Sequence, residues 1–321
     1  MASEVGTAVH EEGWVPDIPE ISPVRLDHTD FAGIQRELDE QGFACIKECL
    51  NAEELEIARE MLWQHLEGAE TPQTLPDGEC HRRERPVGWK RDDVTSWTEG
   101  HGCGLMTSTV HCDAMWYTRT RVGVNSGFRA AYREDDLTAA YDRMSVNLPT
   151  ATGNKTVLQK AATSYEHGKL DMMDLHTHAN TYYDERNGKP FTDFYSIVPL
   201  WDMNKATGAT AVVPGSHKHV KHINEMRQNM WQHDETQKRG SMEWWRSRKW
   251  TGKSKPGDFH EPFTSIGLVP SVTSVKAGDM VIFDTALYHS GCPSEDPSGR
   301  TGENDERTAP FFSDLISLRK R

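Results

Sequence analysis

The C-terminal half of the chain consists of short apolar segments separated by turn signals, and this pattern restricts the folds that the chain can adopt. Segments with strand character cover residues 175–182, 194–203, 210–213, 271–276, 280–284 and 310–315. Residues 135–141 predict a short helix that leads into a further strand at 141–147. Many short strands with turns between them are typical of an antiparallel sandwich or barrel. The pattern therefore predicts a mainly β fold.

Helical patterns are clearest near the N-terminus, where helices would flank the β core. Residues 31–40 predict a helix, and a short strand should follow at 42–47. A second helix should begin after Asn51, which can cap it, and Glu54 three residues later completes a capping box. The apolar stripe of this second helix is formed by Leu55, Ala58, Leu62 and Leu66.

The chain is expected to form one domain preceded by an irregular arm. Residues 1–24 are acidic and contain proline, which predicts an arm without regular structure. Residues 25–321 would form a single domain with insertions near 68–125 and 220–265 that shape the substrate pocket. The first insertion predicts long loops. In the second, residues 220–250 are expected to be helical, and the Trp-rich segment 242–250 suits either a planar or anionic substrate or an exposed amphipathic helix.

Charge and hydropathy argue against several classes of partner. The formal net charge is −13, which opposes nonspecific binding to nucleic acid. No apolar run approaches the roughly 18 residues that a membrane span needs. The first residues lack a basic start followed by an apolar stretch, so we expect a cytoplasmic protein whose six cysteines are reduced thiols. The expected partner is a small-molecule substrate, and nothing in the sequence indicates an oligomeric state.

Two histidines that lie two residues apart form a candidate metal site. Residues two apart on a strand point to the same face, so His176 and His178 would both point into the barrel. A third imidazole, His289, follows the apolar strand 280–284 and could complete one face of a metal ion. Neutral imidazole is a good ligand for iron, copper, nickel or zinc. A separate run of histidines is interpreted as solvated surface: His217, His219 and His222.

Four segments carry a resemblance to a known family. They are Glu40-Gln-Gly-Phe-Ala-Cys-Ile-Lys-Glu-Cys-Leu-Asn-Ala-Glu-Glu-Leu55, Leu175-His-Thr-His, Ala206-Thr-Gly-Ala-Thr-Ala-Val-Val-Pro-Gly-Ser-His217 and Gly278-Asp-Met-Val-Ile-Phe-Asp-Thr-Ala-Leu-Tyr-His289. In this order they resemble the first strand and helix, the His-x-Asp motif, the strand-and-turn signature and the distal-histidine motif of the phytanoyl-CoA dioxygenase family of iron(II)/2-oxoglutarate oxygenases. The resemblance implies a double-stranded β-helix, the cupin-like jelly roll, with iron(II) between its two sheets and 2-oxoglutarate as cosubstrate.

The metal ligands that the resemblance implies depart from the family at one position. His176 matches the family's first histidine and His289 its distal histidine, whereas His178 stands where the family has an aspartate. His178 could be the third ligand, or it could turn away and leave the position to water or halide, as in related halogenases. Asp174, two residues before His176 on the same strand face, could also bind the metal. We expect the three-histidine set, because an imidazole aimed at the metal would fill an open position.

The replacement of the aspartate changes the charge of the site. One carboxylate leaves iron(II) with a net charge of about +1, whereas three neutral imidazoles leave about +2. A more positive site should favour bound anions and shift the iron potential.

The resemblance also implies an arginine that holds the far carboxylate of 2-oxoglutarate. Arg300 lies eleven residues after His289, and Arg307 lies eighteen residues after it. Arg307 is preferred because it directly precedes a strand-like segment, as the family's arginine does. A guanidinium in this place can form two parallel hydrogen bonds with a carboxylate.

The resemblance thus implies an iron-dependent oxygenase that couples 2-oxoglutarate decarboxylation to oxidation, by hydroxylation, of a small organic substrate. His178 leaves two alternatives open. One is a three-histidine iron dioxygenase or a halogenase-like enzyme without the usual facial triad. The other is a non-catalytic barrel that binds a metal or ligand, against which the intact distal-histidine motif argues.

Overall fold

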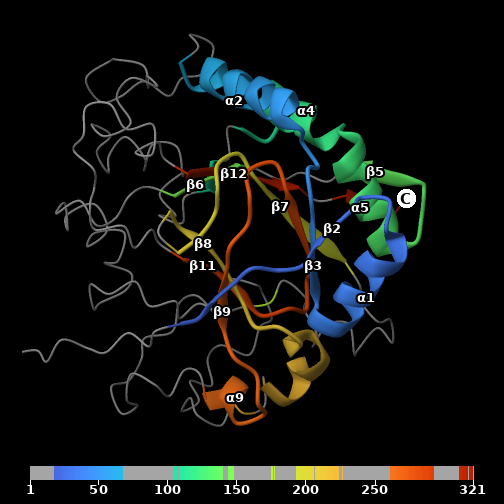
Figure 1. The fold of residues 1–321 in the computed structure, drawn as a ribbon, viewed down its shortest axis with the longest axis vertical. Helices are drawn as coiled ribbons and strands as arrows, with labels where there is room; N and C mark the ends of the chain where they lie inside the picture. Colours follow the sequence, from blue (N-terminus) through green and yellow to red (C-terminus); the bar gives the residue numbers. More distant parts are fainter. Residues whose placement is uncertain are drawn as a thin grey trace, which may run out of the picture.

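Two β-sheets face each other in the centre of the molecule, and helices lie against the outer face of the larger sheet (Figure 1). The computed structural model describes residues 18–67, 105–106, 109–139, 144–147, 175, 177, 193–205, 207–223, 226, 261–292, 311–316 and 318–320. Within these ranges no helix combines the length and the apolar character needed to cross a membrane.

The larger sheet has the strand order β2-β3-β10-β7-β12-β6-β4. Its strands are β2 (Arg25–Leu26), β3 (Phe43–Ile46), β4 (Leu105–Met106), β6 (Met144–Asn147), β7 (Phe194–Pro199), β10 (Met280–Asp284) and β12 (Phe311–Ile316). Neighbouring strands are antiparallel except β2 and β3, which run parallel. The antiparallel architecture confirms the mainly β fold predicted from the turn pattern.

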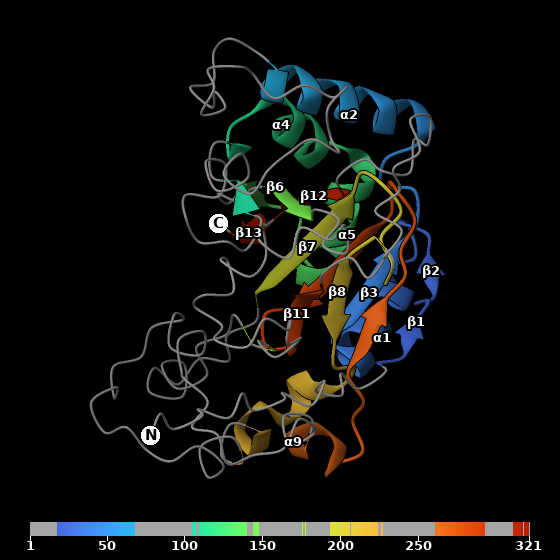
Figure 2. The same cartoon turned by 90° about the vertical axis from the view of Figure 1, so that its left-hand side faces the viewer.

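The smaller sheet has the order β1-β9-β8-β11 (Figure 2). Its strands are β1 (Glu20–Ile21), β8 (Ala209–Val212), β9 (Ser271–Thr273) and β11 (His289–Cys292). From β7 onward the chain passes repeatedly between the sheets, because β7, β10 and β12 belong to the larger sheet and β8, β9 and β11 to the smaller one. This alternation is the double-stranded β-helix, or jelly roll, that was predicted.

The helices form a layer on one side of the jelly roll. They are α1 (Phe31–Gln41), α2 (Ala52–Glu67), α4 (Asp113–Arg119) and α5 (Val122–Tyr132). Two shorter elements lie next to strands of the smaller sheet. The 3-10 helix η3 (Ser216–His219) follows β8, and α9 (Glu261–Thr264) precedes β9. Buried residues of the four longer helices share one apolar cluster with the outer face of the larger sheet.

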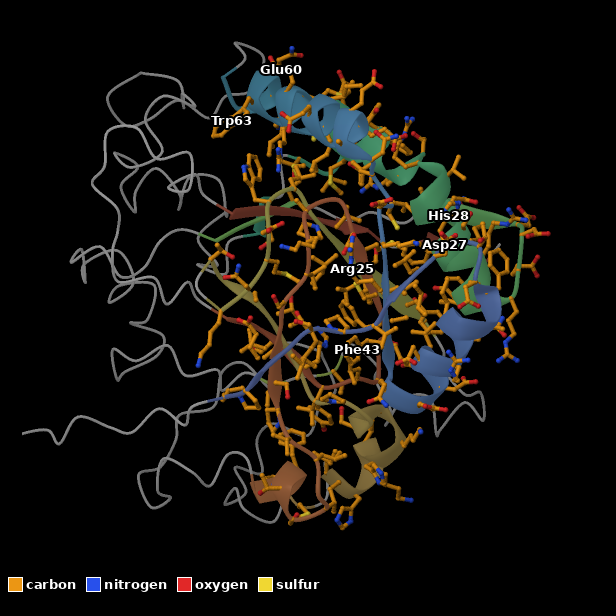
Figure 3. The ribbon with its side chains drawn as sticks, viewed as in Figure 1. Arg25, Asp27, His28, Phe43, Glu60 and Trp63 are labelled. Atoms are coloured by element: carbon orange, nitrogen blue, oxygen red, sulfur yellow. The ribbon has the colours of Figure 1, made fainter. Side chains whose placement is uncertain are left out.

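Strand β10 is buried on both faces and separates two apolar clusters. Met280 and Ile282 belong to the cluster beneath the helices, whereas Val281 and Phe283 belong to the cluster between the sheets. This period of two places alternate side chains in different cores. Figure 3 shows one labelled member of each cluster, Phe43 on β3 between the sheets and Trp63 on α2 beneath the helices.

Both N-terminal helices agree with the sequence analysis. The helix predicted over 31–40 is α1, in which Asp30 Oδ1 accepts a hydrogen bond from the Gly33 N–H (2.9 Å). The capping box of α2 is confirmed. Asn51 Oδ1 accepts from the Glu54 N–H (3.0 Å), and Glu54 Oε2 accepts from the Asn51 N–H (3.0 Å).

Three local predictions differ from the structure. The helix predicted at 135–141 is wrong, because Leu137–Ala139 form strand β5, which pairs with β13 (Leu318–Lys320). The irregular arm predicted for 1–24 includes strand β1, which pairs in parallel with β9, and the buried Ile18. Residues 1–17 lie outside the described residues. The loops predicted for 68–125 include α4 and the start of α5. Strands β1 and β5 depend on partners that are distant in sequence. Helix α4 is too short to show a clear helical period of apolar residues.

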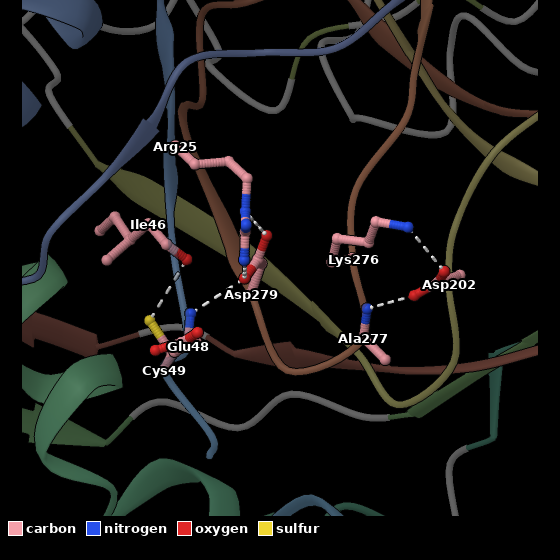
Figure 4. Close-up of polar contacts among 8 residues, drawn as sticks. All are labelled: Arg25, Ile46, Glu48, Cys49, Asp202, Lys276, Ala277 and Asp279. Carbon is pink, nitrogen blue, oxygen red and sulfur yellow. Dashed lines mark hydrogen bonds and ion pairs between the residues drawn. The ribbon is translucent and has the colours of Figure 1, made fainter. Parts of the chain in front are cut away.

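The start of β10 is anchored by a buried carboxylate (Figure 4). The Asp279 side chain is 1% exposed and accepts two hydrogen bonds from Arg25, Nε to Oδ2 at 2.7 Å and Nη2 to Oδ1 at 2.8 Å. Its Oδ1 also accepts from the Glu48 N–H at 2.9 Å. Asp279 therefore joins β2, the end of β3 and the start of β10 through one carboxylate.

We expect Asp279→Ala to lower the free energy of unfolding by about 2 kcal/mol or more, because it leaves the Glu48 N–H and the Arg25 guanidinium without their acceptor. The matched control is Lys276→Ala, which breaks the exposed Lys276–Asp202 pair (67% and 51% exposed) and should cost less than about 0.5 kcal/mol. Urea unfolding measures both. Equal losses in the two variants would show that the buried carboxylate has no special role.

Candidate active site

His289, the distal histidine of the sequence analysis, is the first residue of β11. It lies opposite Val212 of β8 in the ladder of the smaller sheet, and it is 6% exposed. A four-residue turn, 285–288, connects it to β10 of the larger sheet. This position at the junction of the two sheets agrees with a residue that points into a jelly roll.

One hydrogen bond determines which nitrogen of His289 can act as a ligand. The ring Nδ1 lies 2.9 Å from the Leu287 carbonyl oxygen. A carbonyl oxygen only accepts, so Nδ1 must carry the proton, and in the neutral ring the lone pair is on Nε2. Metal-binding histidines commonly have this arrangement, in which the second ring nitrogen donates to a backbone carbonyl. The chemistry of His289 therefore fits a metal ligand.

An aromatic side chain restricts the His289 ring further. The Phe283 ring centroid lies 4.7 Å from that of His289, with an angle of 52° between the ring planes. Phe283 also contacts Tyr195 of β7 at a centroid distance of 6.4 Å. The Phe283 ring, which contacts both Tyr195 and His289, thus forms an apolar surface on one side of the imidazole. Phe283 was not singled out from the sequence, although its place two residues after Val281 predicts that it points between the sheets.

Leu175, which immediately precedes His176, is 5% exposed. Its side chain belongs to the same apolar cluster as Val213 and Tyr288, and Tyr288 immediately precedes His289. The segment that carries the His-Thr-His motif and the segment that carries the distal histidine therefore contribute to one cluster.

The other predicted site residues lie outside the described residues: His176, His178, Arg300, Arg307 and the alternative ligand Asp174. Among the residues that are described, no three His, Cys, Asp or Glu side chains form a group that could hold a metal ion. Of the predicted metal ligands, the structure describes His289, and His176 and His178 stay predictions.

The histidine run after β8 is only partly solvated. His219 and His222 are exposed, as predicted. The prediction holds only in part for His217, which is half-buried: its ring packs against Gly42, with Nε2 3.3 Å from the Asp39 carbonyl oxygen. Burial lowers the pKa of His217 below its ordinary value of 6.5. Its ring therefore serves as a packing group between the smaller sheet and α1.

Two acidic side chains lie where β7 begins and β10 ends, the buried Asp193 and the half-buried Asp284. Asp193 accepts a hydrogen bond from the Tyr132 hydroxyl of α5, and its backbone carbonyl accepts from the Thr285 N–H at 3.0 Å. Asp284 accepts from the Ala286 N–H at 2.7 Å. Burial raises the pKa of Asp284 from 3.8 to about 6, the Ala286 hydrogen bond opposes this shift, and the charge of Asp193 adds to it. The turn that leads to His289 therefore begins at a carboxylate that is costly to ionise.

The described part of the site is thus a buried histidine, hydrogen-bonded to a backbone carbonyl, at the start of the edge strand of the smaller sheet of a jelly roll. A family model, phytanoyl-CoA dioxygenase (PhyH), matches residues 38–301, which is most of the chain. The chain belongs to the phytanoyl-CoA dioxygenase family. This confirms the resemblance drawn from the four sequence motifs.

Solved structures with a similar arrangement share little sequence with the chain. The non-heme alpha ketoglutarate dependent epimerase SnoN from nogalamycin biosynthesis is 14% identical, with 92% of this chain and 84% of that chain covered and a TM-score of 0.45. SnoN has also been solved with Fe3+, alpha ketoglutarate and a nogalamycin compound. AviO1 from Streptomyces viridochromogenes is 14% identical, with 90% and 93% covered and a TM-score of 0.41. No curated protein matches the chain. These similarities are too low to assign a role to any residue.

The raised pKa of Asp284 predicts a specific dependence of stability on pH. Between about 4 and about 6 the folded protein holds this proton more tightly than the unfolded chain, so the contribution of Asp284 to stability falls as the pH rises through this range and is constant above it. Asp284→Asn keeps an acceptor for the Ala286 N–H and removes the titration. We expect the variant to be more stable than wild type at pH 7, by about 3 kcal/mol, and nearly equal to it at pH 4.

Thermal and urea unfolding across this pH range test the expectation, with Asp135→Asn as the control. The Asp135 side chain is 77% exposed, so its replacement should leave the pH profile nearly unchanged. A difference between Asp284→Asn and wild type that does not vary with pH would contradict the interpretation.

Proposed function

We propose that the chain is a non-haem iron enzyme that couples 2-oxoglutarate decarboxylation to the oxidation, by hydroxylation, of a small organic substrate. Family membership supports this class of chemistry. The observation that carries the proposal within this chain is the buried His289 ring, whose Nδ1 is committed to the Leu287 carbonyl and whose Nε2 can bind a metal. Iron(II) with 2-oxoglutarate and oxygen would supply the oxidative chemistry when bound.

The residues of the chain would hold the cofactors and exclude water. We propose His176, His178 and His289 as the metal ligands, with Nε2 of His289 directed to the ion. Phe283 would keep one side of the His289 ring apolar. Arg307 would bind the distal carboxylate of 2-oxoglutarate through two parallel hydrogen bonds, and Arg300 is the alternative.

A second candidate function follows from His178 at the family's carboxylate position. A centre of three neutral imidazoles could bind substrate directly and act as a dioxygenase without 2-oxoglutarate. Succinate production separates the two functions. The first predicts succinate from 2-oxoglutarate, increased by the correct substrate. Oxygen uptake with substrate but without succinate would support the second.

The ligand set predicts a graded response of metal binding to substitution. His176→Ala and His289→Ala should abolish binding, because these are the two histidines that match the family's metal ligands. His178→Ala should weaken binding less, since water can take the vacated position. His178→Asp restores the family's carboxylate and should keep iron binding while changing activity or product. Metal titration and oxygen uptake measure these effects, and His222→Ala, at an exposed histidine, is the control.

One result would reject the three-histidine site. If His178→Ala has the metal affinity and turnover of wild type, His178 is not a ligand. The position is then open to water or halide, or it is filled by Asp174.

The two arginines predict opposite behaviour toward 2-oxoglutarate. Arg307→Ala should raise the 2-oxoglutarate concentration needed for half-maximal succinate production by about a hundredfold, because a bidentate charged pair is lost. Arg300→Ala should change this 2-oxoglutarate concentration less than about threefold, because Arg300 is not the arginine proposed to bind the cosubstrate. The reverse result would identify Arg300 as the residue that binds the cosubstrate.

A further inference from the structure

Segments that are far apart in the sequence meet beside the turn that leads to His289. The Asp284 N–H donates to the Gly42 carbonyl at 2.9 Å. Gly42 has a φ of 82°, and a Cβ there would lie 2.5 Å from His217 Nδ1 and 2.8 Å from Leu287 Cδ1. The start of β3, the turn after β8 and the turn after β10 are therefore packed together at a point where no side chain fits.

Ser216 lies in this junction and binds the Leu287–Tyr288 peptide group, near His289. It is 0% exposed, and its Oγ accepts a hydrogen bond from the Tyr288 N–H at 3.0 Å. The Ser216 N–H in turn donates to the Val213 carbonyl at 3.0 Å, and the Val213 N–H donates to the Tyr288 carbonyl at 2.9 Å. Ser216 and Tyr288 are thus connected through both backbone and side chain.

The same peptide group orients the His289 ring. The peptide plane between Leu287 and Tyr288 makes both hydrogen bonds. Its N–H, from Tyr288, donates to Ser216 Oγ, and its carbonyl, from Leu287, accepts from the His289 Nδ1–H. In a trans peptide the C=O and N–H point in opposite directions and cannot rotate independently. Ser216 Oγ, this peptide and His289 Nδ1 therefore form a continuous chain of hydrogen bonds, in which each bond polarises the next.

We infer that Ser216 is a positioning residue for the metal ligand His289. By fixing the Leu287–Tyr288 peptide, it keeps Nδ1 protonated and Nε2 directed to the ion. The inference rests on the proposed function, in which His289 binds iron(II). The hydrogen-bond chain consists of groups of the protein alone, so it can be tested separately from metal binding.

The test compares Ser216→Ala with Thr273→Val in the full-length protein. Thr273 is also 0% exposed in the smaller sheet, and its hydroxyl donates to the Thr210 carbonyl at 2.8 Å, so this control removes one buried hydroxyl without touching the peptide before His289. Two measurements are made. Nitrogen NMR of the histidine rings, assigned with His289→Ala, reports the His289 tautomer in metal-free protein. Titration with Fe(II) under anaerobic conditions, repeated with Co(II) for its optical spectrum, reports affinity.

We expect Ser216→Ala to weaken metal binding about tenfold and to convert the single His289 tautomer into a mixture. Thr273→Val should lose similar thermal stability but change affinity less than twofold and leave the tautomer unchanged. If Ser216→Ala does not fold, Ser216→Cys, which keeps the volume but is a weak acceptor, takes its place. A folded Ser216 variant with wild-type tautomer and affinity would overturn the inference. If wild type and His289→Ala bind metal equally, the proposed function fails, and the tautomer measurement still decides whether Ser216 orients the ring.

Discussion

Burial of the larger sheet on both faces is the constraint on which most of this structure depends. Helices cover its outer face and the smaller sheet covers its inner face, so β10 carries apolar side chains in both directions. Charged groups would be costly in the middle of such a strand, because an unpaired charge in an apolar environment loses its hydration. The ionisable residues of β10 and its flanks accordingly lie at its two ends, with Asp279 before it and Asp284 at its last position.

The two aspartates show how the surroundings determine the cost of that burial. Asp279 accepts hydrogen bonds from the Arg25 guanidinium and from the Glu48 N–H, so its charge is compensated and ties three elements together. Asp284 accepts from a backbone N–H and lies near the like charge of Asp193, so burial dominates and raises its pKa to about 6. One end of β10 thus stabilises the fold, whereas the other, next to the candidate site, retains a carboxylate that is costly to ionise.

Structural features that depend on residues close together in the sequence could be predicted. Features that depend on pairing between distant segments could not. Asn51 and Glu54 are three residues apart, so their capping box could be recognised without a fold. Strand β5 could not, because its partner β13 lies some 180 residues later. His289 was predicted from a motif, and its buried position agrees. Ser216 belongs to a recognised motif as well, but its role depends on a peptide 72 residues away and is visible only in three dimensions.

The arrangement around His289 also explains why a metal site would be built at a strand start next to a tight turn. A free imidazole rotates about two bonds, and binding a metal would have to stop that rotation at a cost in entropy. Here the Leu287 carbonyl fixes one ring nitrogen and Phe283 limits the ring plane. The ladder between β11 and β8 fixes the backbone that carries the ring. Most of that entropy is lost when the protein folds, so a metal bound through Nε2, as proposed, would not have to order this side chain.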